Sequence, residues 1–243
     1  MSTLEVRGLR KAYGAIVVAD DVSFTLDRGT CLGVIGPNGA GKSSLFNLLT
    51  GVAVPDAGSV RLDGRELVGL PAHRRARLGV ARAFQIPQPF AGLTVLLNVR
   101  AAASFGAGLH GAAAEHAARQ ALERTGLADA AHQPAGALTL LDRKRLELAK
   151  GVACAPRVLL LDEVAGGLTE REVALIVALV RELKQTLAVI WIEHIAHALM
   201  AVADRVLVLH FGRKLLEDAP AAAMASPEVQ QIYMGMPADA AAA

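Results

Sequence analysis

Short stretches of alternating apolar and polar residues mark the first third of the chain, and glycine-containing turns separate them. A period of two is typical of a half-buried strand, whereas an uninterrupted apolar run is typical of a strand covered on both faces. We expect strands at residues 4–9, 22–26, 31–35, 58–62 and 79–84, with turns at residues 11–14 and 27–29. An apolar-faced helix is expected from about Lys42 to Gly51.

The pattern changes between about residues 87 and 155, where alanine-rich sequence with scattered glycine and proline shows no strand signal. We expect this segment to be a helical subdomain. Strand patterns return at residues 157–161, 187–192 and 205–209, with helices from about Thr169 and over residues 195–202, and short helices at the end. Thr169 and Glu172 have the spacing of a capping box. Strands that alternate with helices predict an α/β domain with a parallel sheet.

Composition narrows the class of protein only in part. The 243 residues are 53% hydrophobic, which is ample for one core. A formal net charge of +2 gives no reason to expect a nucleic-acid partner, and the basic segment at residues 73–77 fits a solvated helix face. Neither a signal peptide nor a membrane-spanning run is visible. We expect Cys31 and Cys154 to be reduced, buried thiols in a cytosolic protein.

A glycine-rich loop between the expected strand at residues 31–35 and the following helix carries the clearest chemical signal. Its pattern is G-x-x-x-x-G-K-[ST], which in a strand–loop–helix context predicts a phosphate-binding loop. Glycines let successive N–H groups turn towards anionic oxygens, and the helix N-terminus adds a favourable dipole. Lys42 would reach the β- and γ-phosphates of a nucleoside triphosphate, and the Ser43 hydroxyl would bind Mg²⁺. The binding residues expected here are Gly36, Asn38, Gly39, Ala40, Gly41, Lys42, Ser43 and Ser44.

Two acids follow the apolar run at residues 158–161. Asp162 and Glu163 would lie at the carboxyl end of a strand, where open α/β sheets bind their ligands. A nucleoside triphosphatase needs a carboxylate for Mg²⁺ and a group that orients the attacking water. We therefore expect Asp162 to hold Mg²⁺, partly through water, and Glu163 to act as the general base.

At this point the chain resembles the ATP-binding subunits of ATP-binding cassette (ABC) transporters, over about residues 4–236. The glycine loop corresponds to the Walker A motif, and residues 158–162 correspond to Walker B. The resemblance implies a P-loop NTPase fold with a mixed, largely parallel sheet core, an N-terminal antiparallel β subdomain and an inserted helical subdomain. It also implies ATP and Mg²⁺ as cofactors.

Further site residues come from this resemblance. It implies that Tyr13 stacks on adenine and that Gln85 is the Q-loop glutamine, which contacts Mg²⁺ and couples to the membrane partner. It also implies that His194 is the switch histidine that contacts the γ-phosphate. Residues 166–169 occupy the position of the D-loop. Taken singly, each of these side chains would more often be an ordinary surface or packing residue.

The segment that corresponds to the family's Leu-Ser-Gly-Gly-Gln signature departs from it. Its residues are Thr139, Leu140, Leu141 and Asp142, after Leu138. Thr139 keeps a hydroxyl and can cap a helix, but both glycines are absent and Asp142 adds a negative charge. Val164 also stands where the family usually has proline. In the family this segment faces ATP bound on the opposite subunit, so a homodimer would have two altered sites and a heterodimer one. The sequence is compatible with a homodimer and with a heterodimer. It is also compatible with a variant signature that still functions because its backbone donors are preserved.

Residues 80–99, the Ile192–His194 end of a strand and Gly235 are similar to the branched-chain amino acid importer group. That similarity implies two transmembrane permease subunits, a second ATPase subunit, an indirect role for a periplasmic binding protein, and a peripheral location on the cytoplasmic face of the bacterial inner membrane. Relatives carry branched-chain amino acids, amides or urea-like solutes, and the cargo is selected by other subunits. Residues 87–99 are the expected partner contact.

The resemblance implies a single domain over residues 1–236. A RecA-like core would cover about residues 1–86 and 156–215, with the helical subdomain at about 87–155 and C-terminal helices at 216–236. Residues 237–243 are expected to be a disordered tail.

Three other classes stay as alternatives. A soluble cassette ATPase of translation or DNA repair usually has two cassettes or a long coiled coil, and this chain has neither. A regulatory subunit with a degenerate composite site is suggested by the altered signature, although Glu163 and His194 oppose it for the chain's own site. A small-molecule kinase would not need Gln85, His194 and the helical insertion.

Overall fold

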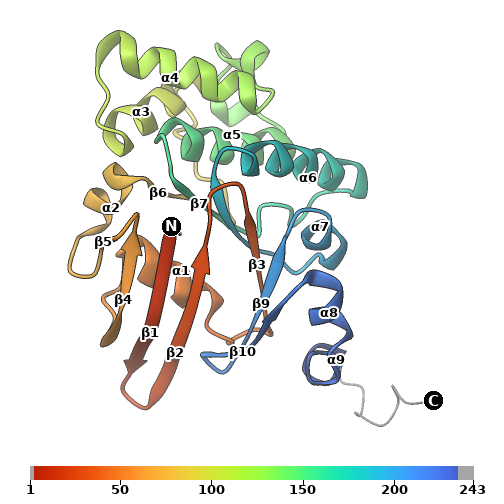
Figure 1. The fold of residues 1–243 in the computed structure, drawn as a ribbon. Coiled ribbons are helices and arrows are strands. Elements are labelled where there is room, and N and C mark those ends of the chain that lie inside the picture. The colour runs from red at the N-terminus through yellow and green to blue at the C-terminus, as the bar shows by residue number, and fades with distance from the viewer. Residues whose placement is uncertain (1–2, 235–243) are drawn as a thin grey trace.

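Two sheets form the frame of the molecule (Figure 1). In the computed structural model, which describes residues 3–234, a six-stranded sheet has the order β10-β9-β3-β8-β7-β6. Its strands are β3 (Cys31–Ile35), β6 (Val80–Ala83), β7 (Val158–Asp162), β8 (Ala188–Ile192), β9 (Arg205–His210) and β10 (Arg213–Asp218). All neighbours pair in parallel except β9 and β10. The predicted largely parallel α/β core is confirmed.

The second sheet is antiparallel and has the order β2-β1-β4-β5. Its strands are β1 (Leu4–Tyr13), β2 (Ile16–Leu26), β4 (Ala57–Leu62) and β5 (Arg65–Glu66). The turn expected at residues 11–14 is wrong in its bounds, because β1 continues to Tyr13 and only the next two residues form the turn. Register shifts between β1 and β2 allow both strands to extend past the stretch of regular alternation.

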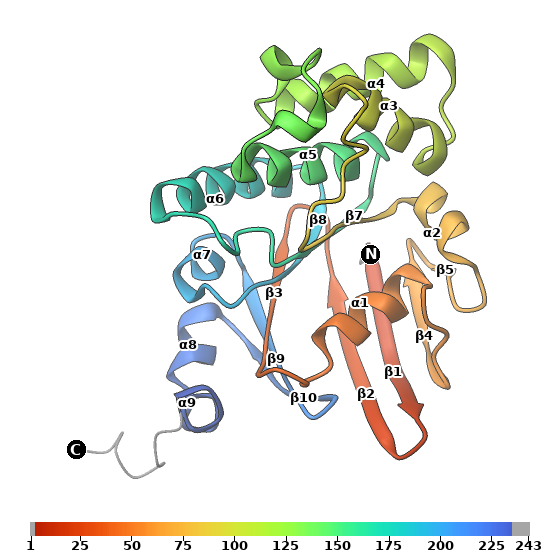
Figure 2. The ribbon, with the colours of Figure 1, turned by 180° about the vertical axis from the view of Figure 1, so that it is seen from behind.

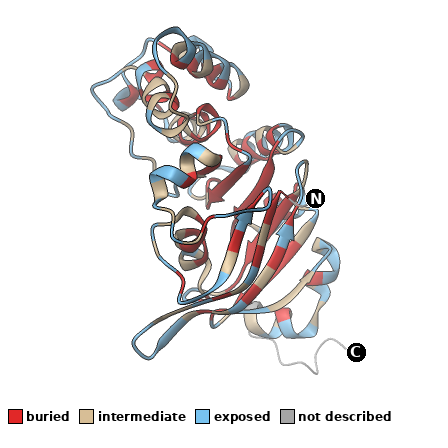
Figure 3. Ribbon diagram, turned by 60° about the vertical axis from the view of Figure 1, so that its left-hand side comes forward, coloured by how far each residue is buried: buried red, intermediate tan, exposed pale blue. Residues whose placement is uncertain are grey.

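Helix α1 (Lys42–Thr50) lies between the two sheets (Figure 2). Its buried residues Leu45, Phe46, Leu48 and Leu49 belong to one apolar cluster with residues of both sheets. The six-stranded sheet separates this cluster from a second one because its side chains alternate: Leu160 of β7 faces α1, whereas Leu161 faces the other helices. Figure 3 shows buried residues concentrated on the strands of both sheets. Burial on both faces explains the uninterrupted apolar runs.

Residues 84–157, all of which the structure describes, contain helices and no named strand. These are α3 (Val95–Gly106), α4 (Gly111–Arg124) and α5 (Leu140–Ala153), with two short 3₁₀ turns at Ala128–Ala130 and Ala135–Ala137. They form a layer at one end of the molecule, beyond β6 and β7 (Figures 1 and 2). Among the described residues, none of the helices combines the length and the apolar character that crossing a membrane requires.

The remaining helices are α2 (Ala72–Leu78), α6 (Glu170–Lys184), α7 (Ala196–Met200), α8 (Pro220–Ala225) and α9 (Pro227–Met234). Thr169 and Glu172 make both bonds of the predicted capping box at the start of α6. Strand β10 was not predicted, and its last residues, 216–218, lie where C-terminal helices were expected. Its sequence does not alternate regularly, and a register shift between Lys214 and Leu216 accompanies its pairing with β9. The tail predicted at residues 237–243 lies outside the described residues.

The basic segment at residues 73–77 forms α2, but it is not wholly a solvated face. Arg75 is 1% exposed, and its guanidinium donates to the carbonyl oxygens of Leu48 at 2.7 Å, Leu49 at 3.0 Å and Leu70 at 3.0 Å. Two of these acceptors belong to the last turn of α1, whose carbonyls have no partner within the helix. Arg75 therefore ties α2 to the C-terminal end of the helix that begins at the phosphate loop.

We expect Arg75→Met to lower the free energy of unfolding by about 2–4 kcal/mol, because it leaves buried carbonyls without charged donors. Thermal unfolding followed by circular dichroism measures this as a fall in Tm of roughly 4–16 °C for a chain of this size. Arg74→Met, at the exposed neighbouring position, is the matched control and should leave Tm nearly unchanged. Equal effects of the two substitutions would contradict the role assigned to Arg75.

Candidate functional site

The carboxyl ends of four neighbouring parallel strands meet at one edge of the large sheet. Gly36 follows β3, His194 follows β8, Glu163 follows β7 and Gln85 follows β6. A hollow of about 660 Å³ at this edge is lined by Gly36, Pro37, Asn38, Lys42, Gln85, Glu163, His194 and Ile232. The structure thus brings together residues that were predicted from four separate parts of the sequence. Ile232 of α9 was not predicted, because nothing in the sequence of that helix indicated its position.

The glycine-rich loop has the backbone geometry that its sequence predicted. Gly41 has a φ of 102°, and a Cβ atom there would collide with the carbonyl oxygen of Val18 in β2. Only glycine combines that φ with that contact. The amide of Gly212 donates to the carbonyl oxygen of Ala40 at 3.0 Å, which fixes the loop from its other side. The structure gives no side-chain cap to the first turn of α1, so the amides of that turn can receive an anion.

Lys42 bends back over the loop. Its ammonium donates to the carbonyl oxygens of Gly36 at 2.6 Å and Pro37 at 3.0 Å. Burial lowers the pKa of Lys42, and the nearby carboxylates of Glu163 and Asp162 act in the opposite direction. The ammonium is thus held at the mouth of the loop, where it can exchange carbonyl partners for phosphate oxygens.

Asp162 and Ser43 line an adjoining hollow of about 540 Å³ together with Gln85. Asp162 is 6% exposed and pairs with Arg82, which also donates to the side-chain oxygen of Asn47 at 2.8 Å. One carboxylate, one hydroxyl and one amide oxygen fit Mg²⁺, which usually takes one or two protein carboxylates and completes its shell with phosphates and water. No cluster of three His, Cys, Asp or Glu side chains suited to a metal occurs among the described residues. The donor set fits a magnesium ion shared with a nucleotide.

Glu163 has an unusual backbone conformation. Its φ is 46°, and its amide donates to the carbonyl oxygen of Ile192 at 2.9 Å. A non-glycine residue in the left-handed region is uncommon and often marks a functional site. Its carboxylate accepts a hydrogen bond from the side chain of Gln85. A carboxylate fixed this way next to a phosphate loop can accept a proton from an attacking water.

His194 lies beside two carboxylates. Its Nδ1 is 3.8 Å from an oxygen of Glu163 and 3.2 Å from an oxygen of Glu193. The side chain is 60% exposed, so the ring is open to the hollow. A Cβ atom at Gly166 would lie 3.6 Å from Cε1 of His194, which places the expected D-loop against the ring.

Two buried charged residues of the site were not predicted. Glu193 is 1% exposed and Lys144 is 3% exposed. The ammonium of Lys144 donates to the carbonyl oxygens of Gln85 at 2.5 Å and Glu163 at 3.3 Å, so α5 is tied to both loops. Burial lowers the pKa of Lys144, and the charge of Glu193 opposes this most strongly. The sequence signal for Glu193 was its place directly before His194, whereas Lys144 looked like one of several basic residues on a helix surface.

Tyr13 ends β1 and is 55% exposed. The ammonium of Lys11 is 5.1 Å from the centre of its ring. β2, the strand that follows, touches the phosphate loop through Val18 and Gly41. The ring is therefore exposed on a strand paired with β2, which is compatible with stacking on a base.

The signature segment is not brought to this hollow. Thr139 caps α5: its hydroxyl accepts from the amide of Asp142 at 3.2 Å and donates to the carboxylate of Asp142 at 2.9 Å. Arg145 lies 3.3 Å from the other oxygen of Asp142. Leu140 is 46% exposed. None of these residues lines the hollow at the phosphate loop, and Thr139 and Leu140 are exposed, so the segment is accessible to another molecule.

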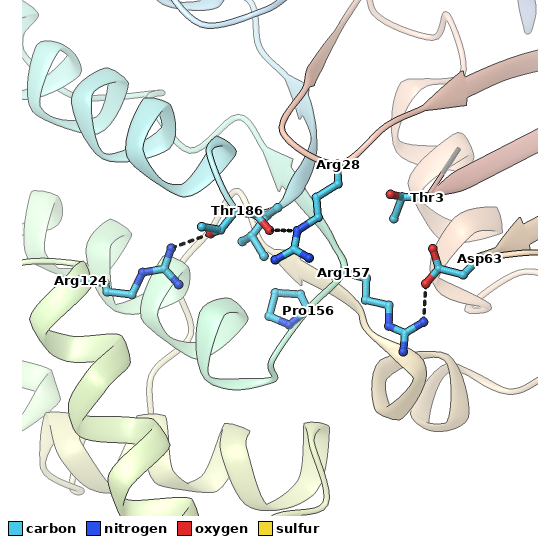
Figure 4. A pocket seen from close by; sticks show the side chains of 8 residues that line it. Thr3, Arg28, Asp63, Arg124, Pro156, Arg157 and Thr186 are labelled. Carbon is cyan, nitrogen blue, oxygen red and sulfur yellow. Dashed lines mark hydrogen bonds and ion pairs between the residues drawn. The ribbon is translucent and has the colours of Figure 1, made fainter. Parts of the chain in front are cut away.

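Another hollow, of about 520 Å³, lies at the opposite edge of the sheet (Figure 4). Arg28 donates to the carbonyl oxygen of Thr186 at 2.8 Å, and Arg124 donates to the hydroxyl of Thr186 at 3.2 Å. Arg157 pairs with Asp63. Arg28, Arg157 and Thr186 stand before β3, β7 and β8, at the amino ends of the strands, where open α/β sheets do not place their ligands. The three arginines secure loops at that edge.

Comparisons with known proteins agree with this geometry. Residues 19–166 match the family described as ABC transporter. The chain is 35% identical to the high-affinity branched-chain amino acid transport ATP-binding protein BraF of Pseudomonas aeruginosa, over 96% of this chain and 97% of BraF. It is 33% identical to the corresponding protein LivG of Escherichia coli K12, over 96% of this chain and 97% of LivG.

Solved structures give the same result for the fold. A nucleotide-free ATP-binding cassette from an ABC transporter superposes with a TM-score of 0.87 at 25% identity, over 97% of this chain and 100% of that chain. A cassette in its ADP conformation matches with the same TM-score. With the glycine loop, the carboxylates and the histidine converging at one sheet edge, these matches show that the chain belongs to the ABC transporter family and is an ATP-binding cassette ATPase.

Proposed function

We propose that this chain is the ATP-hydrolysing subunit of an importer for branched-chain amino acids or related small solutes, and that the hollow at the carboxyl edge of β3, β7 and β8 is its nucleotide site. The observation that carries the assignment of the site is the convergence of Lys42, Glu163, His194 and Gln85 in one hollow. The relatives' printed function and their coverage of 96% of this chain support the cargo class.

Each residue has a distinct role in this proposal. The loop amides from Gly36 to Ser44 and the ammonium of Lys42 bind the phosphates, and Tyr13 stacks on adenine. Ser43, Gln85 and Asp162 hold Mg²⁺, partly through water, and the bound ion neutralises charge on the phosphates. Glu163 takes the proton of the attacking water, and His194 contacts the γ-phosphate. The hydrogen bond from Gln85 to Glu163 supports a shared position beside that water.

Membrane permeases would contact the surface that follows Gln85. Large apolar side chains there are exposed to solvent: Phe84, Ile86, Phe90, Leu93, Leu97 and Phe105. Exposed apolar surface of this kind usually marks an interaction site when it is contiguous, and these six side chains all fall within residues 84–105. Because the cluster continues from the Q-loop glutamine, closure of the nucleotide site would move the contact with the permeases. In this assembly the chain is peripheral to the cytoplasmic face of the inner membrane, and a periplasmic binding protein delivers the solute.

ATP would be enclosed between the loop of one ATPase subunit and the signature of another. The hydroxyl of Thr139 donates to the carboxylate of Asp142, and that carboxylate would face the polyphosphate of the ATP bound by the partner. A second ATPase subunit with an unaltered signature would complete this chain's own site. We therefore favour a heterodimer, in which one composite site is normal and the other carries Asp142.

Asp142→Gln tests this reading of the signature. Removing the negative charge is expected to raise ATP turnover at the composite site formed by this signature by about 3–10-fold, because a like charge near a polyphosphate costs on the order of 1 kcal/mol. The measurement is steady-state phosphate release by assemblies whose other composite site is inactivated. Asp129→Asn, at an exposed position elsewhere in the helical subdomain, is the control. Unchanged turnover would mean that the segment is a workable variant as it stands.

The proposed function is tested by reconstitution. ATP turnover is measured for the purified chain alone, with its partner ATPase, and with both permeases in proteoliposomes, where uptake of labelled leucine follows addition of ATP and a binding protein. We expect uptake that requires ATP and is lost with Glu163→Gln. ATP binding without turnover in every assembly would favour a regulatory subunit instead. Turnover that is indifferent to permeases would favour a soluble cassette ATPase.

A further inference from the structure

Glu193 is a buried carboxylate between β8 and the histidine of the site. It is 1% exposed, and it is a different residue from Asp162 and Glu163, the two acids predicted at the end of β7. Burial raises the pKa of Glu193, so keeping an acid here has a cost in stability. A residue of this kind is retained either for packing or for a contact that only a carboxylate provides.

Its two oxygens face donors from two loops. One oxygen accepts from the amide of Ala165 at 3.1 Å, directly before the D-loop. The other accepts from the amide of His194 at 3.0 Å and lies 3.2 Å from Nδ1 of the same residue. Donors on both oxygens favour the ionised form over the protonated one. The ammonium of Lys144 supplies a compensating positive charge from α5.

We propose that Glu193 is a positioning residue, whose carboxylate keeps the proton of the His194 ring on Nδ1, turns Nε2 towards the γ-phosphate and fixes the amide directly before the D-loop in the same bond network. The inference rests on the role proposed above for His194. A carboxylate behind a catalytic imidazole selects its tautomer and orientation in many enzymes, and such an arrangement is lost when the acid becomes an amide.

The charged groups around the ring are few among the described residues. Glu163 faces Nδ1 from the end of β7 at 3.8 Å, and Lys144 reaches the same loop from α5. Lys42 lines the hollow from α1. Glu193 is the nearer acceptor for the ring, because its oxygen lies 3.2 Å from Nδ1 and that oxygen of Glu163 is also bonded to Gln85. The same chain offers a comparison, because Nε2 of His197 lies 3.0 Å from the 84% exposed side chain of Glu170.

The first test reads the ring directly. Long-range ¹H–¹⁵N spectra of the full chain labelled in histidine are recorded at about pH 8.5, two units above the usual pKa of histidine of about 6.5. The signals of His194 are assigned from their loss in His194→Gln. We expect the Nδ1–H form in the wild type and a shift towards the Nε2–H form in Glu193→Gln. Glu170→Gln should leave His194 unchanged. A wild-type ring already in the Nε2–H form would overturn the proposal.

The second test is a double-mutant cycle on ATP turnover in the assembly that is active with the wild-type chain. Glu193→Gln is expected to lower kcat by about 10–100-fold with KM for ATP within about twofold. It should have no further effect in a His194→Ala background. An equal loss in that background would show that Glu193 acts on the fold alone. Glu193→Asp keeps a carboxylate that can accept from the backbone amides, so it should recover part of kcat even where Glu193→Gln unfolds.

The two proposals fail in different ways. If His194→Ala hydrolyses ATP as well as the wild type, the role proposed for His194 is wrong, and the catalytic part of the Glu193 inference falls with it. If turnover depends on His194 but Glu193→Gln changes neither the tautomer nor kcat, only the inference about Glu193 is overturned.

Discussion

Glu163→Gln is expected to lower kcat for ATP hydrolysis by about 10²–10⁴-fold, the usual contribution of a general base. The amide has the same shape as the carboxylate but does not accept the proton of the attacking water. Gln85 would still find an oxygen to bond, and the φ of 46° at position 163 would suit glutamine as poorly as glutamate. Folding and ATP binding should therefore be nearly unchanged.

Steady-state phosphate release with the partner ATPase present measures the effect, and fluorescence titration with a labelled ATP analogue checks that binding is retained. Glu182→Gln, at an exposed position of α6, is the control for removal of an acid. Residual turnover above about a tenth of the wild-type value would contradict the role of Glu163 as the base, because a general base contributes at least about 10².

The sequence predicted those parts of the site that depend on local spacing. The glycine loop, its strand and its helix lie within twenty neighbouring residues, and backbone sterics alone restrict which residues can form such a loop. Asp162 and Glu163 followed from a buried strand and the rule for sheet edges. Gln85 and His194 came from the resemblance to a family, since a single glutamine or histidine carries little signal.

Contacts between distant segments were not predictable in this way. Arg75, Lys144 and Glu193 are buried because each meets partners from elsewhere in the chain: Leu48, Gln85 and Ala165 are examples. From the sequence alone, these three residues would be expected at the surface, because charged residues in or beside helices and strands are ordinarily solvated. Strand β10 was missed for a related reason, because it pairs with β9 through backbone bonds while its own side chains are half exposed. Tertiary partners, rather than local pattern, decide such positions.

Lys42→Met is expected to weaken ATP binding by at least about tenfold, because hydrogen bonds to a charged group contribute about 1.5–3 kcal/mol each. In the absence of nucleotide the lysine is held by the carbonyl oxygens of Gly36 and Pro37, and its burial carries a desolvation cost. Methionine keeps most of the length of the side chain and avoids that cost. The folded chain without nucleotide should therefore unfold at nearly the same temperature as the wild type.

Thermal unfolding with and without nucleotide separates these two effects. A ligand at 100 times its Kd stabilises the folded state by about 2.7 kcal/mol, or roughly 5–11 °C for a chain of this size. We expect most of this shift to disappear in Lys42→Met, whereas Lys214→Met, on β10, should retain it. If Lys42→Met lowered Tm without nucleotide as much as it reduced the shift, the lysine would hold the loop together rather than bind phosphate. If the shift survived intact, the phosphates would be bound by the loop amides and the dipole of α1 alone.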